Sequence, residues 1–242
     1  MIPGPIVEGD LQHLPPPTLE RLATLRNFGL ENLKAGRRVI VAARKLYGDW
    51  QKDLSDYYLG LLKNQAQARE LVSRLMKGQD VGVLSDAGAP GIADPGAELV
   101  QAAHLLAVPV RPLVGPSAIP LALMASGLDG QEFAFNGYLP VKGADRKKAL
   151  KRLEHLSLTT GQTQLFMETP YRNDALFGSA LEALRAETLF TVAANILSEQ
   201  AAIRTLPVGS WQELPGYSIG KVPAVFGIGQ VVGKPEALLL TD

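Results

Sequence analysis

The sequence predicts an α/β protein divided into two domains. Short runs of β-branched and aromatic residues alternate along the chain with segments of helical periodicity, which is typical of the α/β class. Proline and glycine between Val114 and Ile119 mark a change of segment, so we place the boundary there, with domains at 1–114 and 115–242. Because 46% of the 242 residues are apolar, the chain can bury one large core or two smaller ones.

The first segment, 2–25, is a short apolar run interrupted by proline and glycine and followed by a helical pattern. It predicts a short strand, a loop, and a helix entered after Pro17 with Thr18 as its N-cap. The apolar run 37–45 fits either a short strand or the buried end of a helix, because three β-branched residues follow one another in it.

A helix is predicted over 65–77, where apolar residues recur at helical spacing and Gly78 occupies a position that commonly ends a helix. The continuous apolar run 81–86 predicts a buried parallel strand that ends in Ser-Asp. A loop, a helix over 97–107 and a second strand over 108–114 are expected next. This order favours parallel pairing of the two strands through a right-handed crossover.

The second domain continues the alternation. A loop at its start turns into a helix of small residues, a basic amphipathic helix starts near Lys142, and another helix is expected over 174–186. The strands are predicted over 133–140, 163–170 and 189–196 and within 221–232.

Composition narrows the classes of function. Lys and Arg together number 24, as do Asp and Glu, so the net charge gives no strong attraction to a polyanion or an anionic membrane. There is no cysteine and the three histidines lie far apart in the sequence, so we expect no bound metal. The first residues lack the features of a signal peptide, and no apolar segment approaches the roughly 20 residues that span a bilayer. We therefore expect a cytoplasmic protein that does not associate with membranes.

The segment 85–96, SDAGAPGIADPG, is the most informative one for function. It packs three glycines, two prolines and two aspartates directly after a predicted buried strand. Glycine allows backbone amides to approach a ligand closely, and a carboxylate at a strand end accepts hydrogen bonds from an ammonium group or a ribose hydroxyl. The segment is neither a P-loop nor a GxGxxG dinucleotide loop. A rigid surface turn with capping aspartates is the alternative interpretation.

Two further segments bring polar groups to the ends of predicted elements. Ser117 and Ala118 start the helix of segment 114–127, where unsatisfied backbone amides can bind a polar ligand group, although simple capping by Ser117 explains the pattern equally well. The motif ETPYRN at 168–173 follows a predicted strand and combines a carboxylate, an aromatic ring and an arginine. Each of these motifs is weak evidence when taken alone.

Taken together, four segments resemble the tetrapyrrole methylase family of methyltransferases, which use S-adenosylmethionine (SAM). Within that family they resemble the branch that methylates the 2′-hydroxyl of a cytidine in small-subunit ribosomal RNA. In chain order the segments are VGVLSDAGAPGIADPGAELV, RPLVGPSAIPLALMASGL, FAFNGYLPVK and LFMETPYRN. Four motifs in this order and spacing are specific, and they run through most of the chain.

The resemblance implies a homodimer of two-domain protomers that needs no metal. It implies a parallel sheet in the N-terminal domain, a mixed sheet in the C-terminal domain, and SAM in a cleft between them. The N-terminal domain would hold the acceptor side and the glycine-rich loop, and the C-terminal domain would hold the adenosine and form the dimer. The positions that the resemblance assigns to SAM are Pro5, Asp86, Gly88, Ala89, Ser117, Ala118, Met167, Asn195 and Ala224.

The sequence departs from that branch in its first third. The first strand is cut to a few residues before PIVEGDLQHLPP. The Glu-Asp-Thr-Arg motif of the branch is matched only by Glu31-Asn32, with Arg37 and Arg38 further along. Because this part would help to hold the acceptor, the departures leave the identity of the acceptor open.

Methyl transfer to a ribose hydroxyl requires a group that takes the hydroxyl proton. The catalytic candidates are Glu31, Asp94 and Glu168, for each of which a helix cap or a surface ion pair is the alternative role. Tyr171 and Arg172 are candidates for substrate binding, and an interdomain salt bridge is the alternative for Arg172.

The basic segment after Pro140 bears on the choice of acceptor. Its cations are Lys142, Arg146, Lys147, Lys148, Lys151 and Arg152. They would hold an RNA backbone if they faced the cleft, or would form a solvated helix face. We expect a methyltransferase that acts on ribose 2′-hydroxyls in ribosomal RNA processing. The alternatives are a methyltransferase for a tetrapyrrole or another small molecule, and a SAM-binding protein without catalysis.

Overall fold

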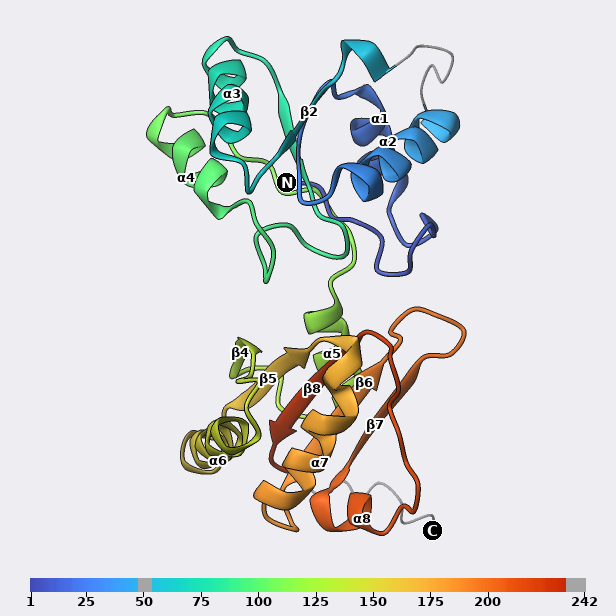
Figure 1. The fold of residues 1–242 in the computed structure, drawn as a ribbon, viewed down its shortest axis with the longest axis vertical. Helices are drawn as coiled ribbons and strands as arrows, with labels where there is room; N and C mark the ends of the chain where they lie inside the picture. The colour runs from blue at the N-terminus through green and yellow to red at the C-terminus, as the bar shows by residue number, and fades with distance from the viewer. Residues whose placement is uncertain (48–53, 234–242) are drawn as a thin grey trace. The chain divides into compact units, whose positions relative to one another are not determined.

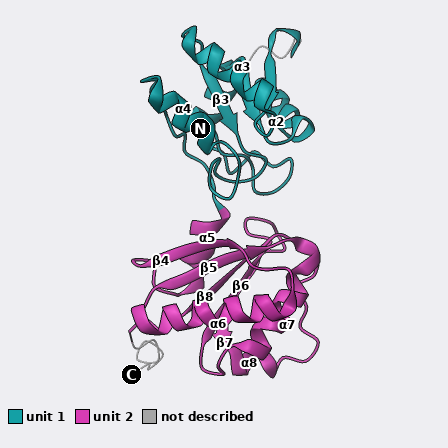
Figure 2. Ribbon diagram, turned by 60° about the vertical axis from the view of Figure 1, so that its left-hand side comes forward, with its two compact units in different colours: residues 1–117 teal, residues 118–242 magenta. Residues whose placement is uncertain are grey.

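The chain folds into two compact units, Met1–Ser117 and Ala118–Asp242, in the computed structural model, which describes residues 1–47 and 54–233 (Figures 1 and 2). Each unit contains its own sheet, of three strands in the first and five in the second. The break between the units falls inside the stretch 114–119, where proline and glycine interrupt the pattern of the sequence.

A parallel sheet forms the centre of the N-terminal unit. Its strands are β1 (Asn27–Leu30), β2 (Tyr58–Leu61) and β3 (Val81–Leu84), in the order β2-β1-β3. β1 pairs in parallel along its whole length with both neighbours, so the carboxyl ends of the three strands lie at one edge of the sheet. The parallel sheet and the strand expected over 81–86 are thus confirmed, whereas β1 and β2 were not predicted.

Helices cover this sheet on both sides (Figure 1). They are α1 (Pro16–Thr24), α2 (Leu33–Tyr47), the 3-10 turn η1 (Leu54–Asp56), α3 (Gln65–Met76) and α4 (Ala97–Leu105). α1 and α2 enclose a core that contains Leu22, Phe28 and Ile40. α3 and α4 close a smaller core around Leu71 and Leu99. The helix predicted over 65–77 is confirmed, and Gly78 follows it with a left-handed φ of 72°.

Two local features of this unit are decided or corrected by the structure. Residues 37–45 are helical and belong to α2, and at the start of that helix the side-chain oxygen of Asn32 accepts the Lys34 N–H over 2.8 Å. Thr18 is not the N-cap of α1, which begins at Pro16. The proline ring already holds a helical φ, so the N-cap is Pro15 and the helix starts three residues earlier than predicted. The Thr18 hydroxyl instead donates to the Val114 carbonyl over 2.7 Å.

The strand predicted over 108–114 is wrong. The structure assigns no strand there, although the Met1 amine donates to the Arg111 carbonyl and the Leu113 N–H donates to the Met1 carbonyl, each over 2.9 Å. Pro109 and Pro112 lack the N–H groups that a continuous ladder needs. The parallel partner of β3 is β1, so the predicted crossover unit that links 81–86 to 108–114 is not formed.

The C-terminal unit is built on a mixed sheet with the order β4-β5-β8-β6-β7. β4 and β5 are parallel, whereas β8 is antiparallel to β5 and β6, and β7 is antiparallel to β6. The strands are β4 (Phe133–Tyr138), β5 (Thr163–Glu168), β6 (Leu189–Ala194), β7 (Ala202–Pro207) and β8 (Ala224–Gly229). The expected mixed sheet is confirmed, and β7 is the strand that the sequence pattern did not reveal.

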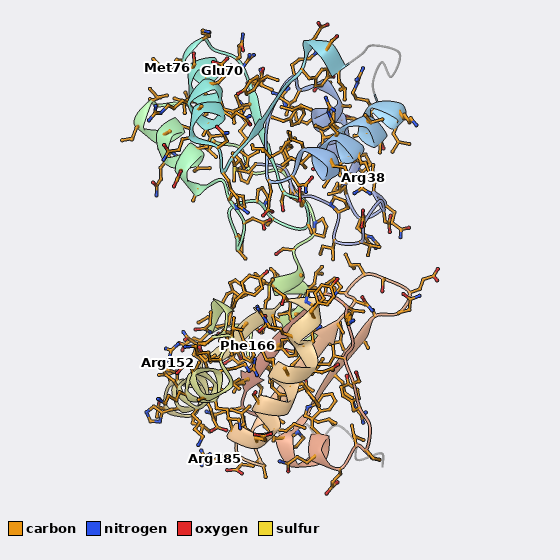
Figure 3. All side chains as sticks on the ribbon, in the orientation of Figure 1. Arg38, Glu70, Met76, Arg152, Phe166 and Arg185 are labelled. Carbon is orange, nitrogen blue, oxygen red and sulfur yellow. The ribbon has the colours of Figure 1, made fainter. Side chains whose placement is uncertain are left out.

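The two faces of this sheet are covered by different helices. These are α5 (Ala118–Ser126), α6 (Gly143–Thr160), the 3-10 turn η2 (Pro170–Arg172), α7 (Asn173–Ala183) and α8 (Val208–Gln212). α6, α7 and α8 cover a core in which Phe166 lies within 5.9 Å and 6.5 Å, centroid to centroid, of Phe226 and Phe190 (Figure 3). α5 covers the opposite face, on which Leu165 and Val225 lie. Within the described residues, none of the helices has the length and apolar character needed to span a bilayer.

Candidate functional site

Charged side chains follow all three strands of the parallel sheet at its carboxyl edge. Glu31 comes directly after β1, Lys63 comes two residues after β2, and Asp86 comes two residues after β3. Because the strands are parallel and in register, these residues leave the sheet at the same edge. Open α/β sheets bind their ligands at this edge, so we place the candidate site there.

The glycine-rich loop 85–96 is held in shape by a buried serine. Ser85 is 3% exposed, and its hydroxyl donates to the Asp94 carboxylate and accepts the Ala87 N–H over 3.2 Å. Gly88 and Gly91 have left-handed φ angles of 80° and 81°, which a residue with a side chain rarely adopts. The loop therefore doubles back so that Asp94 lies beside Ser85, the first residue after β3.

The N-terminal residues lie directly against this loop. The Gly4 N–H donates to the Gly88 carbonyl over 2.9 Å, and the Gly88 N–H donates back to Gly4 over 3.1 Å. A Cβ atom on Gly4 would lie 2.1 Å from the Ser85 carbonyl oxygen, so only glycine fits. Pro5 follows as a buried residue. Pro5 is thereby brought next to the loop that contains Asp86, Gly88 and Ala89.

Three carboxylates and one ammonium group share this edge. The Lys63 Nζ lies 2.9 Å from the Glu31 Oε1, and this bond and charge raise the pKa of Lys63. Burial raises the pKa of Asp86, and the Glu31 charge raises it further against an opposing hydrogen bond from the Asn32 N–H. Burial likewise raises the pKa of Asp94. The hydrogen bond from Ser85 lowers this pKa, whereas the charges of Glu31 and Asp86 raise it further. With four ionised groups the cluster has an excess of negative charge, which suits a cationic ligand.

Ser117 and Ala118 lie on either side of the break between the units. A Cβ atom on Gly88 would lie 3.8 Å from the Ser117 Cα, so the glycine loop and the end of the N-terminal unit are neighbours. Ala118 starts α5 and packs, like Met167 of β5, against the small apolar cluster of the C-terminal unit. The structure therefore places Ser117 beside the glycine loop, and it places Ala118 and Met167 against the same apolar cluster.

The other predicted residues of the C-terminal unit gather at one end of its sheet. Glu168 ends β5 and pairs with Ala224, the first residue of β8, which also pairs with Ala194 at the end of β6. Asn195 follows β6 with a left-handed φ of 52°, and its N–H donates to the Pro223 carbonyl over 2.9 Å. Residues from three strands thus meet at this end.

Glu168 and Arg172 form an ion pair inside the C-terminal unit. The Glu168 Oε1 accepts from the Arg172 Nη2 over 2.6 Å, from the Arg172 Nε over 2.9 Å and from the Thr169 N–H over 2.6 Å. Burial opposes ionisation of Glu168, but these hydrogen bonds outweigh it and lower the pKa of the carboxyl. Arg172 thus has a carboxylate partner four residues away within its own unit. Tyr171 is 81% exposed, with the Lys221 Nζ 5.5 Å from its ring centroid.

The basic helix is less uniform than its sequence indicates. Arg146 is 7% exposed and its Nε donates to the Ser179 hydroxyl over 3.0 Å, and Lys147 pairs with Glu182. Lys148, Lys151 and Arg152 are exposed on one face of α6. Helical geometry places Lys151 and Arg152, which come three and four residues after Lys148, on the same side of the helix as Lys148.

Sequence reasoning missed Lys63 and the structural role of Ser85. Lys63 follows a strand, YLGL, that is too short and too mixed to be recognised from periodicity. Ser85 was visible as the residue after a buried strand, but its role depends on the fold of the loop. Among the residues with described positions, no group of three or more His, Asp or Glu side chains is arranged to hold a metal ion.

These features define a class of protein: a two-unit α/β protein with a parallel and a mixed sheet, whose parallel sheet has charged residues and a glycine-rich loop at its carboxyl edge. The chain belongs to the family described as Tetrapyrrole (Corrin/Porphyrin) Methylases, whose family model matches residues 21–210. The expected family is thus confirmed, and its enzyme class is that of the methyltransferases.

Curated relatives of this chain have the name Ribosomal RNA small subunit methyltransferase I. The Vibrio cholerae protein is 30% identical over 208 residues, which are 86% of this chain and 68% of the relative. The Escherichia coli O157:H7 protein is 33% identical over 179 residues, which are 74% of this chain and 57% of the relative. The match to the Pseudomonas aeruginosa protein, at 35% identity, covers 47% of that relative. The chain thus spans about half to two thirds of the length of these relatives.

Solved structures show the same fold. A uroporphyrin-III-C-methyltransferase from Thermus thermophilus is similar with a TM-score of 0.55 and 22% identity, over 99% of this chain and 96% of that one. The methyltransferase CobJ has a TM-score of 0.59 at 17% identity, over 93% of both chains. A conserved hypothetical protein from Aeropyrum pernix K1 has a TM-score of 0.65 at 17% identity, over 98% of this chain and 86% of that one. At these identities the likeness concerns the fold alone.

Proposed function

We propose that the protein is a SAM-dependent methyltransferase that methylates a ribose 2′-hydroxyl of ribosomal RNA. The observation that carries this proposal is the carboxyl edge of the parallel sheet, where the glycine loop holds Asp86 and Asp94 beside Glu31 and Lys63. The names of the curated relatives support RNA as the acceptor.

The residues present fit SAM. SAM has a sulfonium and an ammonium group, so the excess of negative charge at this edge favours it. Gly88, whose N–H and carbonyl both bond Gly4, shapes the loop through its left-handed φ of 80°. When bound, SAM supplies an electrophilic methyl group, and the protein has to align the acceptor and exclude water. The residues that we propose for SAM are Pro5, Asp86, Gly88, Ala89, Ser117, Ala118, Met167, Asn195 and Ala224.

Among the three catalytic candidates, we propose Asp94 as the group that takes the ribose proton. A proton acceptor works best when its pKa lies close to the working pH, and the pKa of Asp94 is raised. Glu168 is less suited because its pKa is lowered and the guanidinium of Arg172 occupies its Oε1. Glu31 is engaged by Lys63, whose ammonium group could stabilise the developing alkoxide. In the C-terminal unit, the exposed Tyr171 and the free face of Arg172 are proposed to contact the acceptor.

The exposed face of α6 is proposed to bind the RNA backbone through Lys148, Lys151 and Arg152. Three cations on one face can neutralise several phosphates although the chain has equal numbers of acidic and basic residues. Arg146 and Lys147 are left out of this surface because their donors are already used within the unit.

We further propose that the protein is a cytoplasmic homodimer whose C-terminal unit forms the interface. β4 is an edge strand of its sheet, and it exposes 43% of Phe133 and 53% of Tyr138. Large apolar side chains that are exposed on an edge strand promote association with another chain, so we propose that a second copy covers them.

The test of the function is transfer of labelled methyl groups from SAM to ribosomal particles and to free RNA from a strain that lacks this gene. We expect alkali-resistant label in small-subunit ribosomal RNA, since a methylated 2′-hydroxyl cannot assist cleavage of the chain. Label in a tetrapyrrole instead, or saturable SAM binding without transfer to any acceptor, would contradict the proposal.

Measuring RNA binding at several salt concentrations tests the contact with RNA. The triple variant K148E/K151E/R152E should lower RNA affinity and reduce the slope of its salt dependence by about one unit for each lost phosphate contact. SAM affinity should stay unchanged. Lys77→Glu, at the end of α3, is the matched control and should bind RNA like the unmodified protein.

A further inference from the structure

The helix α2 of the N-terminal unit carries charge of one sign only. Its 15 residues include no aspartate and no glutamate, and its cations are Lys34, Arg37, Arg38, Arg44 and Lys45. Because the whole chain has equal numbers of acidic and basic residues, this helix is a local concentration of positive charge. Neither the proposed SAM site nor the basic face of α6 accounts for it.

Four of these cations line up along the exposed side of α2. Val39, Ile40 and Ala43 are buried and direct the opposite side into the core. Steps of three, four and eleven residues return to the same side of a helix, and all four cations on that side are exposed (Figure 3). This basic stripe consists of Lys34, Arg37, Arg38 and Lys45, and at 1.5 Å per residue it is about 16 Å long.

Arg44 does not belong to the basic stripe. Its side chain is only 4% exposed, and its guanidinium lies 5.1 Å from the centroid of the Tyr57 ring. Arg44 therefore has a structural role in the core, which separates it from the four exposed cations.

Few carboxylates neutralise the basic stripe. The Arg38 Nη1 lies 2.6 Å from the Glu8 Oε1, but both side chains are more than half exposed, and such pairs contribute little. Glu31, which comes just before α2, is bonded to Lys63. Within residues 1–47 and 54–233, the other three cations of the stripe form no ion pair. Most of this charge is therefore available to an external anion.

The arrangement of these cations does not stabilise α2 itself. Lys34 lies in the first turn, where the helix dipole favours acidic residues, and that turn contains none. Arg38 follows Lys34 by four residues, a spacing at which like charges repel each other. A loss of helix stability of this kind is expected where charges are used to bind a partner.

The basic stripe offers charge without aromatic rings. Residues 34–45 include no aromatic residue, and the exposed side chain between the cations is Val41. Proteins that hold single-stranded RNA stack its bases on aromatic rings. Double-stranded RNA is held instead through its phosphates and 2′-hydroxyls, largely by shape. Exposed cations without rings therefore favour a double-stranded partner.

We propose that the basic stripe binds the phosphates of a double-stranded segment of RNA. α2 begins two residues after Glu31, at the carboxyl edge of the parallel sheet, so the stripe starts beside the candidate site. A duplex on the stripe would hold a structured region of the RNA close to the residue that is methylated. The choice of RNA among polyanions rests on the proposed function.

The experiment measures binding of a labelled RNA duplex of about 16 base pairs to the full chain at several salt concentrations. The variant K34Q/R37Q/K45Q removes three charges of the stripe and leaves the pair of Arg38 with Glu8. We expect its affinity to fall at least tenfold at low salt. The slope of the salt dependence should decrease by about one unit for each lost phosphate contact.

The matched control is R69Q/K77Q/R111Q, which removes the same charge from exposed positions of the same unit outside the stripe. It should bind the duplex like the unmodified protein. The stripe variant should melt at the same temperature as the unmodified protein or slightly above it, because repulsion within α2 is relieved. Loss of binding would then not result from unfolding.

Equal duplex affinities of the stripe variant and the control would overturn the proposal. So would tighter binding of a single-stranded RNA of the same length, or a stripe that is needed for binding anionic lipid vesicles but not RNA. Labelled SAM in the same mixtures completes the experiment. Duplex binding that depends on the stripe, without methyl transfer to any RNA, would support the surface and reject the proposed function.

Discussion

Asp86, which we propose to bind SAM, is a residue whose ionised form destabilises the folded protein. Its pKa is raised by burial and then by the Glu31 charge, so the folded protein binds this proton more tightly than the unfolded chain does. The ionised form therefore destabilises the fold as pH rises from the ordinary carboxyl value through the raised pKa. Such a loss of folding stability is expected at a site where a carboxylate stays ionised to bind a cation.

The first prediction concerns Asp86→Asn. Calorimetry should show a loss of SAM affinity of about tenfold or more, because a charge-assisted hydrogen bond is removed. At pH 7 the melting temperature should rise by a few degrees, and the gain should vanish in acid, where Asp86 is protonated in both states. Asp80→Asn, at the other end of β3, is the matched control and should bind SAM normally. Unchanged SAM affinity in Asp86→Asn would reject the role of this carboxylate.

Glu168 is the opposite case, in which ionisation stabilises the fold. Its side chain is fully buried, and its pKa is lowered because Arg172 and Thr169 outweigh the burial. The stability that it contributes is present above the ordinary Glu pKa and is lost as pH falls through the lowered value.

We expect Glu168→Gln to reduce the free energy of unfolding at pH 7 by about 1–2 kcal/mol, a moderate value because Arg172 is partly exposed. Urea unfolding should show that this difference shrinks in acid. Glu182→Gln, which removes an exposed pair with Lys147, should cost less than about 0.5 kcal/mol. A loss that is independent of pH would mean that shape rather than charge is responsible.

At the scale of elements, the glycine loop depends on a contact from a segment far away in the sequence. The chain at Gly4 passes so close to Ser85 that a Cβ atom would lie 2.1 Å from the Ser85 oxygen. Backbone atoms cannot move aside as the end of a side chain can, so this approach fixes where the loop leaves β3.

Gly4→Ala should therefore displace residues 1–5 from the loop, lower the melting temperature by several degrees and weaken SAM binding at least tenfold. Gly178→Ala is the matched control, because nothing lies within 4 Å of its added Cβ on α7. It should keep SAM affinity and leave the melting temperature unchanged or slightly raised. If both variants bind SAM equally well, the contact does not position the loop.

At the scale of the whole molecule, the edge strand β4 predicts self-association. Light scattering after size-exclusion chromatography should give twice the chain mass of 25.9 kDa. The double variant F133E/Y138E should shift the protein towards the monomer, because it places charge on the exposed edge. Leu105→Glu, a substitution of an 89% exposed leucine on α4, is the control and should leave the mass unchanged. A monomeric unmodified protein would exclude the proposed dimer.

Much of the fold could be predicted from the sequence, where the segments were long or fully apolar. β3, β5, β6 and β8 are continuous buried runs, and α3 and α7 have clear helical periodicity. β1 and β2, each of four residues, contain a central glycine and have no period that distinguishes them from loops. The prediction of a strand over 108–114 was wrong because it relied on apolar character alone. Pro109 and Pro112 lack the backbone N–H groups that a strand needs to pair.

The sequence by itself determined the α/β class, the family and the glycine loop with its two aspartates, because these depend on residues that are neighbours along the chain. Only the tertiary structure decided that Lys63 meets Glu31, that Gly4 touches Ser85, and that Arg172 pairs with Glu168 inside its own unit. Most of these contacts join residues that are far apart in the sequence and that meet only when parallel strands pair and loops fold back. A local pattern of residues therefore cannot predict them.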